Sequence, residues 1–347
     1  MPAIAAISQS ALTYNLKVVK RKSNAKIVAM VKANAYGHHL DLITPLIDGA
    51  DVLAVSELPQ AQLLRQKTQR PILLLSGVNT HTELQQALAL NCQIVLHNQE
   101  QIALINSSKQ ALSIWIKIDT GMHRLGLDGA EYQQYLPAIK ANPLIKIECV
   151  MSHFACADEV QNPQNQAQLK AFLQLTDSQT NRSMANSAAI LSNAKTHFEF
   201  VRPGIMLYGA SPFADDFGLK PAMQLSAPII AIKHIKAGEA VGYGANWTAN
   251  KDATIAIIAI GYGDGYPRHA KNGTPILIND QLCPLVGRVS MDMISVDISN
   301  SFAAIGDRAI LWGTDKLRVE TIAKYSSTIS YELLTGISNR VEFIQTI

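Results

Sequence analysis

The sequence predicts an α/β protein with an N-terminal (β/α)8 barrel of the TIM type, followed by a mainly β C-terminal domain. Two observations support this fold class. Before residue 225, short apolar runs alternate with helix-like segments about eight times, as parallel strands linked by helices do. After residue 225, strand-like runs are separated by turn signals such as Asn272-Gly273. We therefore expect a barrel domain over residues 1–225 and a β domain over residues 226–347, with residues 1–10 pairing with the β domain.

Eight strands are expected in the barrel, each short and apolar enough to be buried in a parallel sheet. They cover residues 26–31, 51–56, 71–76, 92–97, 113–119, 146–153, 182–187 and 200–204. Apolar residues at helical spacing mark the segments 58–67, 81–90, 132–140 and 166–176 between them. A doubly wound open sheet is the alternative, but eight units within residues 26–204 favour closure into a barrel.

The second domain is expected to contain six strands. They cover residues 229–235, 253–260, 274–278, 282–288, 294–298 and 308–311. A further strand, at residues 3–7, precedes the barrel.

Composition limits the classes of partner. Of the 347 residues, 48% are apolar and only 16% are charged, so the chain can build a large core. The net charge of +3 indicates no polyanionic partner. The one basic cluster consists of Lys17, Lys20, Arg21, Lys22 and Lys26. It is typical of a solvated helix end, and we expect no binding of nucleic acid.

The cysteines and the hydropathy indicate a cytoplasmic protein. Cys92, Cys149, Cys156 and Cys283 are scattered without metal-ligand spacing, which predicts reduced thiols, no disulfide framework and no metal site. The first residues lack the basic start and long apolar core of a signal peptide. No apolar run approaches the roughly 18–20 residues needed to cross a bilayer, so no membrane contact is expected.

One lysine stands at the end of the first expected barrel strand. Lys32 follows the apolar run of residues 27–31, at the C-terminal mouth where barrels of this type place their chemistry. Such a lysine reaches solvent, pairs with an anion, or reacts. An amine in a partly dry pocket loses its proton more easily, which favours formation of a Schiff base.

Further candidate site residues follow the later strands, at the same expected mouth; most are polar, and two would contribute backbone amides. They are Lys117, Arg124, His153, Ser187, Arg202, Gly204 and Ile205. The ends of the seventh and eighth strands often bind phosphate in this fold. Taken singly, His153 fits a core histidine, Ser187 a helix N-cap, and Arg202 a structural ion pair. A reactive lysine, a phosphate cradle and an arginine at one mouth together predict a site for pyridoxal phosphate.

A glycine-rich segment in the second domain, residues 261–268, does not match a dinucleotide-binding motif. Its third glycine is missing, and Pro267 stands where a helix should begin. The segment instead predicts a rigid turn that presents Tyr262, although a tyrosine between glycines often only packs within its turn.

Six motifs resemble those of the alanine racemases, a family of fold-type III pyridoxal phosphate enzymes. They are KANAYGH at 32–38, KIDTGMHR at 117–124, RPGI at 202–205, GYGDGY at 261–266, GRVSMD at 287–292 and YELLT at 331–335. Their order is that of the family, and they span nearly the whole chain. The resemblance implies a barrel followed by a β domain, and a head-to-tail homodimer in which the partner's β domain completes each active site.

The resemblance also implies roles for individual residues. Lys32 forms the Schiff base with the cofactor. The other residues around the cofactor are Tyr36, His153, Ser187, Arg202, Gly204, Ile205 and Tyr331. Arg202 faces the pyridine nitrogen, while Arg124 and the Met291 backbone hold the substrate carboxylate. Lys117 corresponds to a lysine that is carbamylated in some members.

Two positions depart from the family pattern outside the catalytic residues. His39 replaces a small residue, and Ser290 stands where a cysteine is frequent, near the substrate entrance.

Racemisation requires proton removal from one face of the α carbon and return to the other. In the family, a lysine acts on the proton of the D-isomer and a tyrosine on that of the L-isomer; here these are Lys32 and Tyr262. A tyrosine with an ordinary pKa near 10 needs nearby positive charge or hydrogen-bond donors to act at neutral pH, and His153 and Arg202 are candidates. We expect the chain to interconvert L- and D-alanine and so to supply D-alanine for peptidoglycan.

Three alternatives remain open. A racemase of broader specificity would act on serine or larger amino acids, and the sequence shows no pocket volume that decides against it. A pyridoxal decarboxylase usually has an acidic residue at the pyridine nitrogen, so the presence of Arg202 argues against a decarboxylase. A non-enzymatic pyridoxal carrier would lack the β domain with Tyr262.

Overall fold

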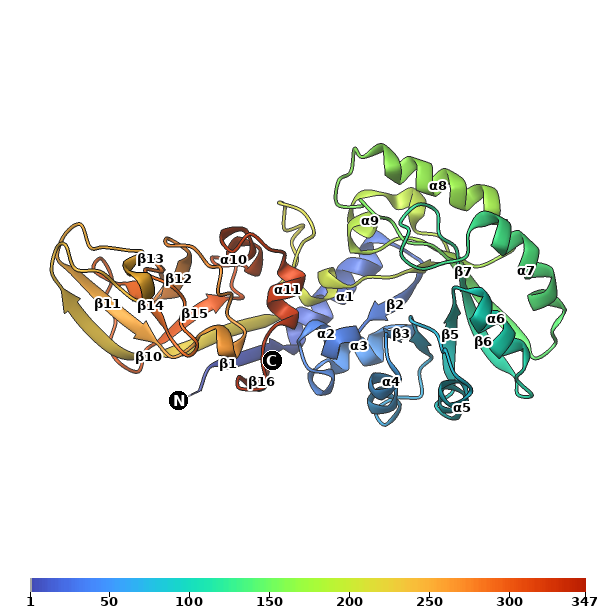
Figure 1. The fold of residues 1–347 in the computed structure, drawn as a ribbon, viewed down its shortest axis with the longest axis horizontal. Coiled ribbons are helices and arrows are strands. Elements are labelled where there is room, and N and C mark those ends of the chain that lie inside the picture. The colour runs from blue at the N-terminus through green and yellow to red at the C-terminus, as the bar shows by residue number, and fades with distance from the viewer. Residues whose placement is uncertain (1) are drawn as a thin grey trace.

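The computed structural model describes residues 2–347 and confirms the predicted fold class. A barrel and a mainly β domain lie beside each other along the long axis of the molecule, and helix α11 (Ser330–Thr335) stands where they meet (Figure 1). The barrel is closed by eight parallel strands in chain order, β2 to β9, with β9 pairing back to β2.

All eight expected barrel strands are present. They are β2 (Lys26–Met30), β3 (Val52–Val55), β4 (Ile72–Leu74), β5 (Cys92–Leu96), β6 (Leu112–Lys117), β7 (Ile145–Met151), β8 (Arg182–Ser183) and β9 (Phe200–Val201). The last two are much shorter than expected. Strand β8 stops early because the side chain of Asn186 accepts a hydrogen bond from the Ala189 N–H, which starts a helix at Ser187. The predicted strand 182–187 is therefore wrong over its last four residues, 184–187.

Helices cover the outside of the barrel (Figure 1). They are α1 (Gln9–Lys22), α3 (Thr44–Gly49), α4 (Leu58–Arg65), α5 (His81–Ala89), α6 (Gln99–Asn106), α7 (Gly129–Ala141), α8 (Pro163–Leu175) and α9 (Ser187–Ser192). The four helices expected from apolar spacing, α4, α5, α7 and α8, are confirmed. Helix α7 begins with a capping box, in which Asp128 and Glu131 each bind the backbone N–H of the other.

The second domain is built on one branched sheet. Its strands are β10 (Met223–Ile235), β11 (Ala253–Ile258), β12 (Pro275–Ile278), β13 (Gln281–Pro284), β14 (Ile294–Asp297), β15 (Arg308–Trp312) and β16 (Glu342–Thr346). Strand β1 (Ile4–Ser8) pairs antiparallel with β10 and parallel with β16. Strand β16 and the helices α10 (Val319–Tyr325) and α11 were not expected from the sequence.

The apolar core is continuous between the two domains. One cluster of buried residues runs from the barrel interior, around Trp115, to the inner face of the β sheet, around Trp312. A small second cluster lies under the outer end of the β domain, around Val241 and Val286. The two domains therefore share buried surface, and this fixes how α11 sits over the barrel.

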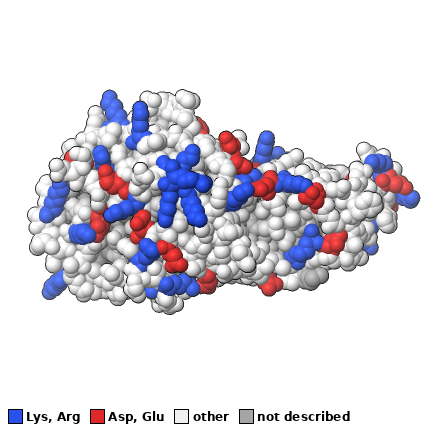
Figure 2. Space-filling view, turned by 180° about the vertical axis from the view of Figure 1, so that it is seen from behind, with Lys and Arg blue, Asp and Glu red and all other residues white. Residues whose placement is uncertain are grey.

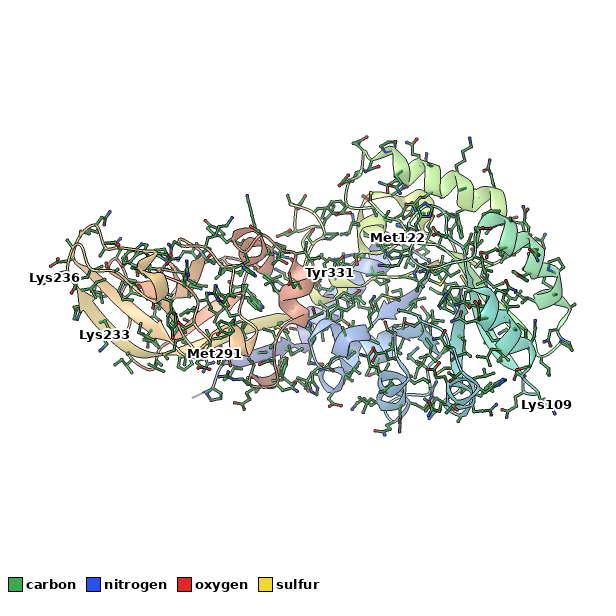
Figure 3. All side chains as sticks on the ribbon, in the orientation of Figure 1. Lys109, Met122, Lys233, Lys236, Met291 and Tyr331 are labelled. Atoms are coloured by element: carbon green, nitrogen blue, oxygen red, sulfur yellow. The ribbon has the colours of Figure 1, made fainter. Side chains whose placement is uncertain are left out.

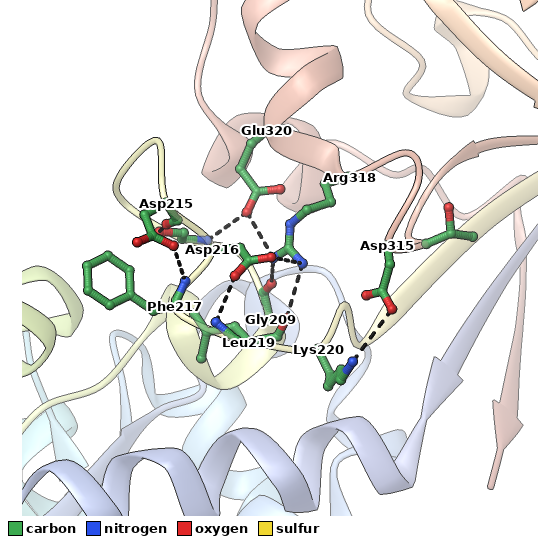
Figure 4. A network of polar contacts seen from close by, with 12 residues as sticks. Gly209, Asp215, Asp216, Phe217, Leu219, Lys220, Asp315, Arg318 and Glu320 are labelled. Atoms are coloured by element: carbon green, nitrogen blue, oxygen red, sulfur yellow. Dashed lines mark hydrogen bonds and ion pairs between the residues drawn. The ribbon is translucent and has the colours of Figure 1, made fainter. Parts of the chain in front are cut away.

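A polar network joins the segment between the domains to α10 (Figure 4). The guanidinium of Arg318 donates to the carbonyl oxygens of Gly209 and Leu219, at 2.6 and 3.1 Å, and pairs with Glu320. Glu320 in turn accepts from the Ser211 N–H at 2.8 Å. These contacts hold residues 209–219, where the chain leaves the barrel, against helix α10.

The surface carries both signs of charge. On the face shown in Figure 2, acidic and basic side chains are interspersed, apart from one gathering of Lys and Arg over the barrel half. No helix within residues 2–347 has the length and apolarity to cross a membrane. Over the same range, no group of three or more His, Cys, Asp or Glu side chains could hold a metal ion.

Candidate active site

A cavity of about 460 Å³ opens at the C-terminal ends of the barrel strands, a size typical of small-molecule sites. Ten of the predicted site residues line it. They are Lys32, Tyr36, Lys117, Arg124, His153, Ser187, Arg202, Gly204, Ile205 and Tyr331. Eight of the ten follow from the strand-end argument, whereas Tyr36 and Tyr331 were expected only from the family resemblance.

Lys32 is followed by a left-handed turn. The four residues from Ala33 to Tyr36 have φ angles between 51° and 58°, a conformation that costs non-glycine residues roughly 1–2 kcal/mol each. The side chain of Asn34 stabilises the turn by accepting from the Leu40 N–H at 2.9 Å. Strain of this kind is typical of functional sites. Here the turn places Lys32 and Tyr36 on the wall of one cavity.

Burial, and secondarily the charge of Arg124, lowers the pKa of the Lys32 amine below its ordinary value. A lysine with a lowered pKa has more of the neutral amine that attacks a carbonyl carbon. Lys32 is therefore suited to form a Schiff base with an aldehyde.

Ser187 and the backbone of residues 204–206 form a cradle for an oxyanion at the cavity. The hydroxyl oxygen of Ser187 accepts from the backbone N–H groups of Gly204, at 2.9 Å, and Met206, at 3.4 Å. The Ser187 O–H therefore remains able to donate into the cavity. Gly204 carries no side chain, and this makes room for the Tyr36 hydroxyl, because an added Cβ would lie only 2.5 Å from it. Ser187 is not the helix N-cap, because Asn186 takes that position.

Two tyrosines border the same end of the cavity. The rings of Tyr36 and Tyr331 are 6.0 Å apart, and Figure 3 shows Tyr331 where the two domains meet. Burial, and less strongly the charge of Asp158, raises the pKa of Tyr331 to about 12. Burial also raises the pKa of Tyr36. Both phenols therefore keep their protons at neutral pH and can donate hydrogen bonds to a phosphate.

Arg202 is held rigidly by its neighbours. Its guanidinium donates to the Ser183 hydroxyl at 2.7 Å, to the carbonyl oxygens of Ser152 and Met184, and to Nδ1 of His153 at 3.1 Å. Burial lowers the pKa of Arg202 to about 10, so it remains charged at neutral pH. No acidic side chain of residues 2–347 pairs with it, which excludes the structural ion pair considered above.

His153 is neutral in this arrangement. Burial, and then the positive charge of Arg202, lowers its pKa well below the ordinary value. Because a guanidinium only donates, Nδ1 of His153 accepts and the ring proton lies on Nε2. His153 thus offers a hydrogen-bond donor but no positive charge to its surroundings.

Lys117, the last residue of β6, and Arg124, in the loop that follows, add two cations to the lining of the cavity. Burial, followed by the charges of Arg202 and Arg124, lowers the pKa of Lys117 to about 8. Asp119 shapes this loop, because its carboxylate accepts from the N–H groups of the three residues 121–123, at 2.8 to 3.2 Å. The role of Asp119 was missed, although an aspartate before a glycine is a signal for such a turn.

Several other cavity residues were also missed. They are Met30, Ala33, Ser56, Leu75, Ser76, Leu125, Met151, Asn186 and Thr335. Ser56 directly follows β3, and Ser76 stands two residues after the end of β4, so the strand-end argument would have found them had it been applied to the second and third strands.

Tyr262 and Met291 do not line this cavity. Both lie on the β domain and are 40% and 52% exposed, and Figure 3 shows Met291 away from Tyr331. They belong to adjacent turns: the Tyr262 N–H donates to the carbonyl of Ser290 at 3.0 Å, and the Gly263 N–H to that of Met291 at 2.8 Å. The structure therefore brings these two residues to each other but not to Lys32 of the same chain.

Comparison with known proteins decides the family. The family model described as alanine racemase, N-terminal domain matches residues 7–212, and the model described as alanine racemase, C-terminal domain matches residues 222–345. The chain belongs to the alanine racemase family. An alanine racemase of Vesicomyosocius okutanii is 64% identical over the whole chain and 99% of its own length.

Solved structures of the family agree over the full length. A biosynthetic alanine racemase from Pseudomonas aeruginosa is 40% identical, with a TM-score of 0.96 over 100% of this chain and 99% of that one. A Bartonella henselae alanine racemase with covalently bound pyridoxal phosphate is 28% identical, with a TM-score of 0.91 over 100% of both chains. The chain is thus an enzyme of the pyridoxal phosphate-dependent alanine racemase family. This confirms the predicted activity and the predicted cofactor. The relatives do not favour the alternative of a racemase with broader specificity.

The cavity fits this cofactor. It offers an amine with a lowered pKa for the aldehyde, the Ser187 hydroxyl beside the backbone of residues 204–206 for the phosphate, and a charged arginine for the ring nitrogen.

Proposed function

We propose that this racemase moves protons with two groups on opposite faces of the α carbon, Lys32 and the partner subunit's Tyr262, in a head-to-tail homodimer. The observation that carries the proposal is the separation within one chain. Lys32 lies in the cavity, while Tyr262 is exposed on the β domain and does not line that cavity. A second subunit is the natural source of the second group.

The chain's own residues hold and orient the cofactor. When bound, pyridoxal phosphate supplies an electron-withdrawing ring that makes the α proton of an amino acid acidic. Ser187, the backbone of Gly204, the N–H of Ile205, and the hydroxyls of Tyr36 and Tyr331 would surround the phosphate. His153 accepts a hydrogen bond from Arg202 and helps to orient its guanidinium, which would face the ring nitrogen. Because Arg202 keeps its proton, it would donate a hydrogen bond to that nitrogen without protonating it, and this would limit side reactions such as transamination.

The remaining residues position the substrate and move its proton. Arg124 and the Met291 N–H bind the carboxylate of alanine, and no acceptor for that N–H lies among residues 2–347. The Lys32 amine serves the face of the D-isomer's proton, and the phenol of the partner's Tyr262 serves the other. A carbamate on Lys117 would place a negative charge beside Arg124 and fix its guanidinium.

The surface of the β domain supports dimer formation. Eight large apolar or aromatic side chains of this domain are between 40% and 72% exposed. They are Ile230, Tyr243, Tyr262, Leu282, Met291, Met293, Ile305 and Ile329. Three of them, Tyr262, Met291 and Met293, come from adjacent turns, and an exposed apolar patch is typical of protein interfaces.

Mixing two inactive variants tests the shared site. Lys32→Ala and Tyr262→Phe are each expected to be inactive alone. If each site combines Lys32 of one subunit with Tyr262 of the other, a mixed dimer has one intact site, and full exchange restores about a quarter of the wild-type racemisation. If each subunit carries a complete site, mixing restores nothing, and the proposal is wrong.

In the cell, we propose that the enzyme acts in the cytoplasm and supplies D-alanine for peptidoglycan. The four cysteines form no disulfide, and three of them are buried, as expected in a reducing compartment. Deletion of the gene is expected to make growth depend on added D-alanine. Growth without it, in a strain that lacks any other racemase, would contradict this role.

A further inference from the structure

Arg340 contacts both of the turns that carry Tyr262 and Met291. Its Nε is 3.1 Å from a carboxylate oxygen of Asp264, in the Tyr262 turn. Its Nη2 is 2.6 Å from a carboxylate oxygen of Asp292, which follows Met291. One guanidinium therefore bridges the two turns through one carboxylate from each.

The turns are matched closely where they meet. The carbonyls of Ser290 and Met291 each accept one N–H from the Tyr262 turn, at 3.0 and 2.8 Å. A Cβ added at Gly261 would collide with both carbonyls, and one added at Gly263 would collide with the Arg340 guanidinium. The second carboxylate oxygen of Asp264 accepts from the Gly261 N–H at 2.9 Å, which closes the Tyr262 turn on itself.

We propose that Arg340 is a positioning residue, which fixes the Tyr262 hydroxyl relative to the Met291 N–H so that the base and the carboxylate contact meet one substrate. This inference rests on the proposed roles of Tyr262 and Met291. A guanidinium is suited to the task, because its planar fork binds two carboxylates at once in fixed directions, which an ammonium group does not.

A purely structural role is a poor explanation for this bridge. The side chains of Arg340 and Asp292 are each about half exposed, at 50% and 52%, and ion pairs of that exposure stabilise a fold weakly. The bridge nevertheless connects the two turns that carry Tyr262 and Met291, and the proposed reaction uses both turns. Its effect is therefore expected in the geometry of catalysis more than in the stability of the domain.

The test uses the holoenzymes of Arg340→Ala, Arg340→Lys and the wild type, with D-alanine in deuterated water. Lys32 alone can exchange the α proton of D-alanine for deuterium, whereas conversion to L-alanine also needs Tyr262. Displacement of Tyr262 by about 1 Å is expected to slow racemisation about a hundredfold while exchange falls less, so the ratio of exchange to racemisation rises. The KM for alanine is expected to rise as well, since the Met291 N–H moves.

Lys236→Ala is the matched control. It removes an exposed ion pair with Asp252, 2.8 Å long, from the same domain, and Figure 3 shows Lys236 at the far end of that domain from Met291. It should leave both the exchange ratio and KM unchanged.

Unchanged KM and exchange ratio in Arg340→Ala, with only a lower melting temperature, would overturn the inference. If that variant does not fold or dimerise by sedimentation, Asp292→Asn removes the exposed half of the bridge and is read in the same way. Tyr262→Phe separates the two hypotheses: an unchanged exchange ratio there contradicts the proposed base itself, whereas a raised ratio there with none in Arg340→Ala contradicts only the role of Arg340.

Discussion

The hydroxyl of Tyr36 lies directly over Gly204, so closely that an added Cβ on Gly204 would be 2.5 Å from it. The two residues come from opposite ends of the barrel sequence, yet together they border the cradle formed with Ser187. Gly204 is therefore required by contact with Tyr36, and not by a positive φ angle.

Gly204→Ala should weaken cofactor binding. The new methyl group pushes the Tyr36 phenol out of place, and loss of one charge-assisted hydrogen bond to phosphate corresponds to about 1.5–3 kcal/mol, or roughly ten- to a hundredfold in Kd for pyridoxal phosphate. Titration of the apoenzyme, followed by its yellow absorbance, measures this. In the double variant with Tyr36→Phe, the collision is relieved, so the two effects should not add. Additive losses would argue against the contact.

Lys117 should react with carbon dioxide in a pH-dependent way. Its pKa of about 8 means that the reactive neutral amine increases as the pH rises through 8, while the nearby charges of Arg202 and Arg124 stabilise a carbamate. When the concentration of dissolved ¹³CO2 is kept the same at both pH values, formation of the carbamate, followed by NMR, should therefore be faster at pH 9 than at pH 7. The signal should be absent in Lys117→Met. A signal of equal size in that variant would show that another amine reacts.

Arg318 should stabilise the junction of the domains. Arg318→Ala leaves the carbonyls of Gly209 and Leu219 without their donor and removes the ion pair of Glu320, which keeps only the Ser211 N–H (Figure 4). A loss of about 2–4 kcal/mol in the free energy of unfolding is expected, since these groups are partly buried. Lys220→Ala is the control, because its pair with Asp315 is exposed and should contribute less than about 1 kcal/mol. Urea unfolding of both variants distinguishes them, and equal losses would refute the role of Arg318.

His38 should make the fold sensitive to acid. It is fully buried, its Nδ1 lies 3.0 Å from the Tyr36 carbonyl oxygen, and burial lowers its pKa from 6.5 to about 4. Below pH 6.5 the unfolded chain binds a proton that the folded chain does not, so the contribution is complete above pH 6.5 and is lost as the pH falls to 4. The difference corresponds to about 3 kcal/mol in the free energy of unfolding. His38→Asn should show a shallower loss between these pH values, and an identical slope would exclude His38 as its cause.

The sequence by itself determined the eight barrel strands, and with them the positions of Lys32, His153 and Arg202. This was possible because apolar runs and strand ends are local features, and a closed parallel barrel brings every strand end to one mouth. The left-handed turn after Lys32 was not predictable, since three of its four residues have no intrinsic preference for that conformation.

Only the tertiary structure decided which residues meet across long sequence separations. Tyr331 reaches the barrel cavity because an unexpected helix, α11, packs where the domains join, and the pairing of Arg340 with Asp264 and Asp292 depends on three turns far apart in the chain. The exposure of Tyr262, away from its own cavity, likewise follows from how the β domain is oriented. Such relationships arise from the packing of whole domains, which no local pattern of residues encodes.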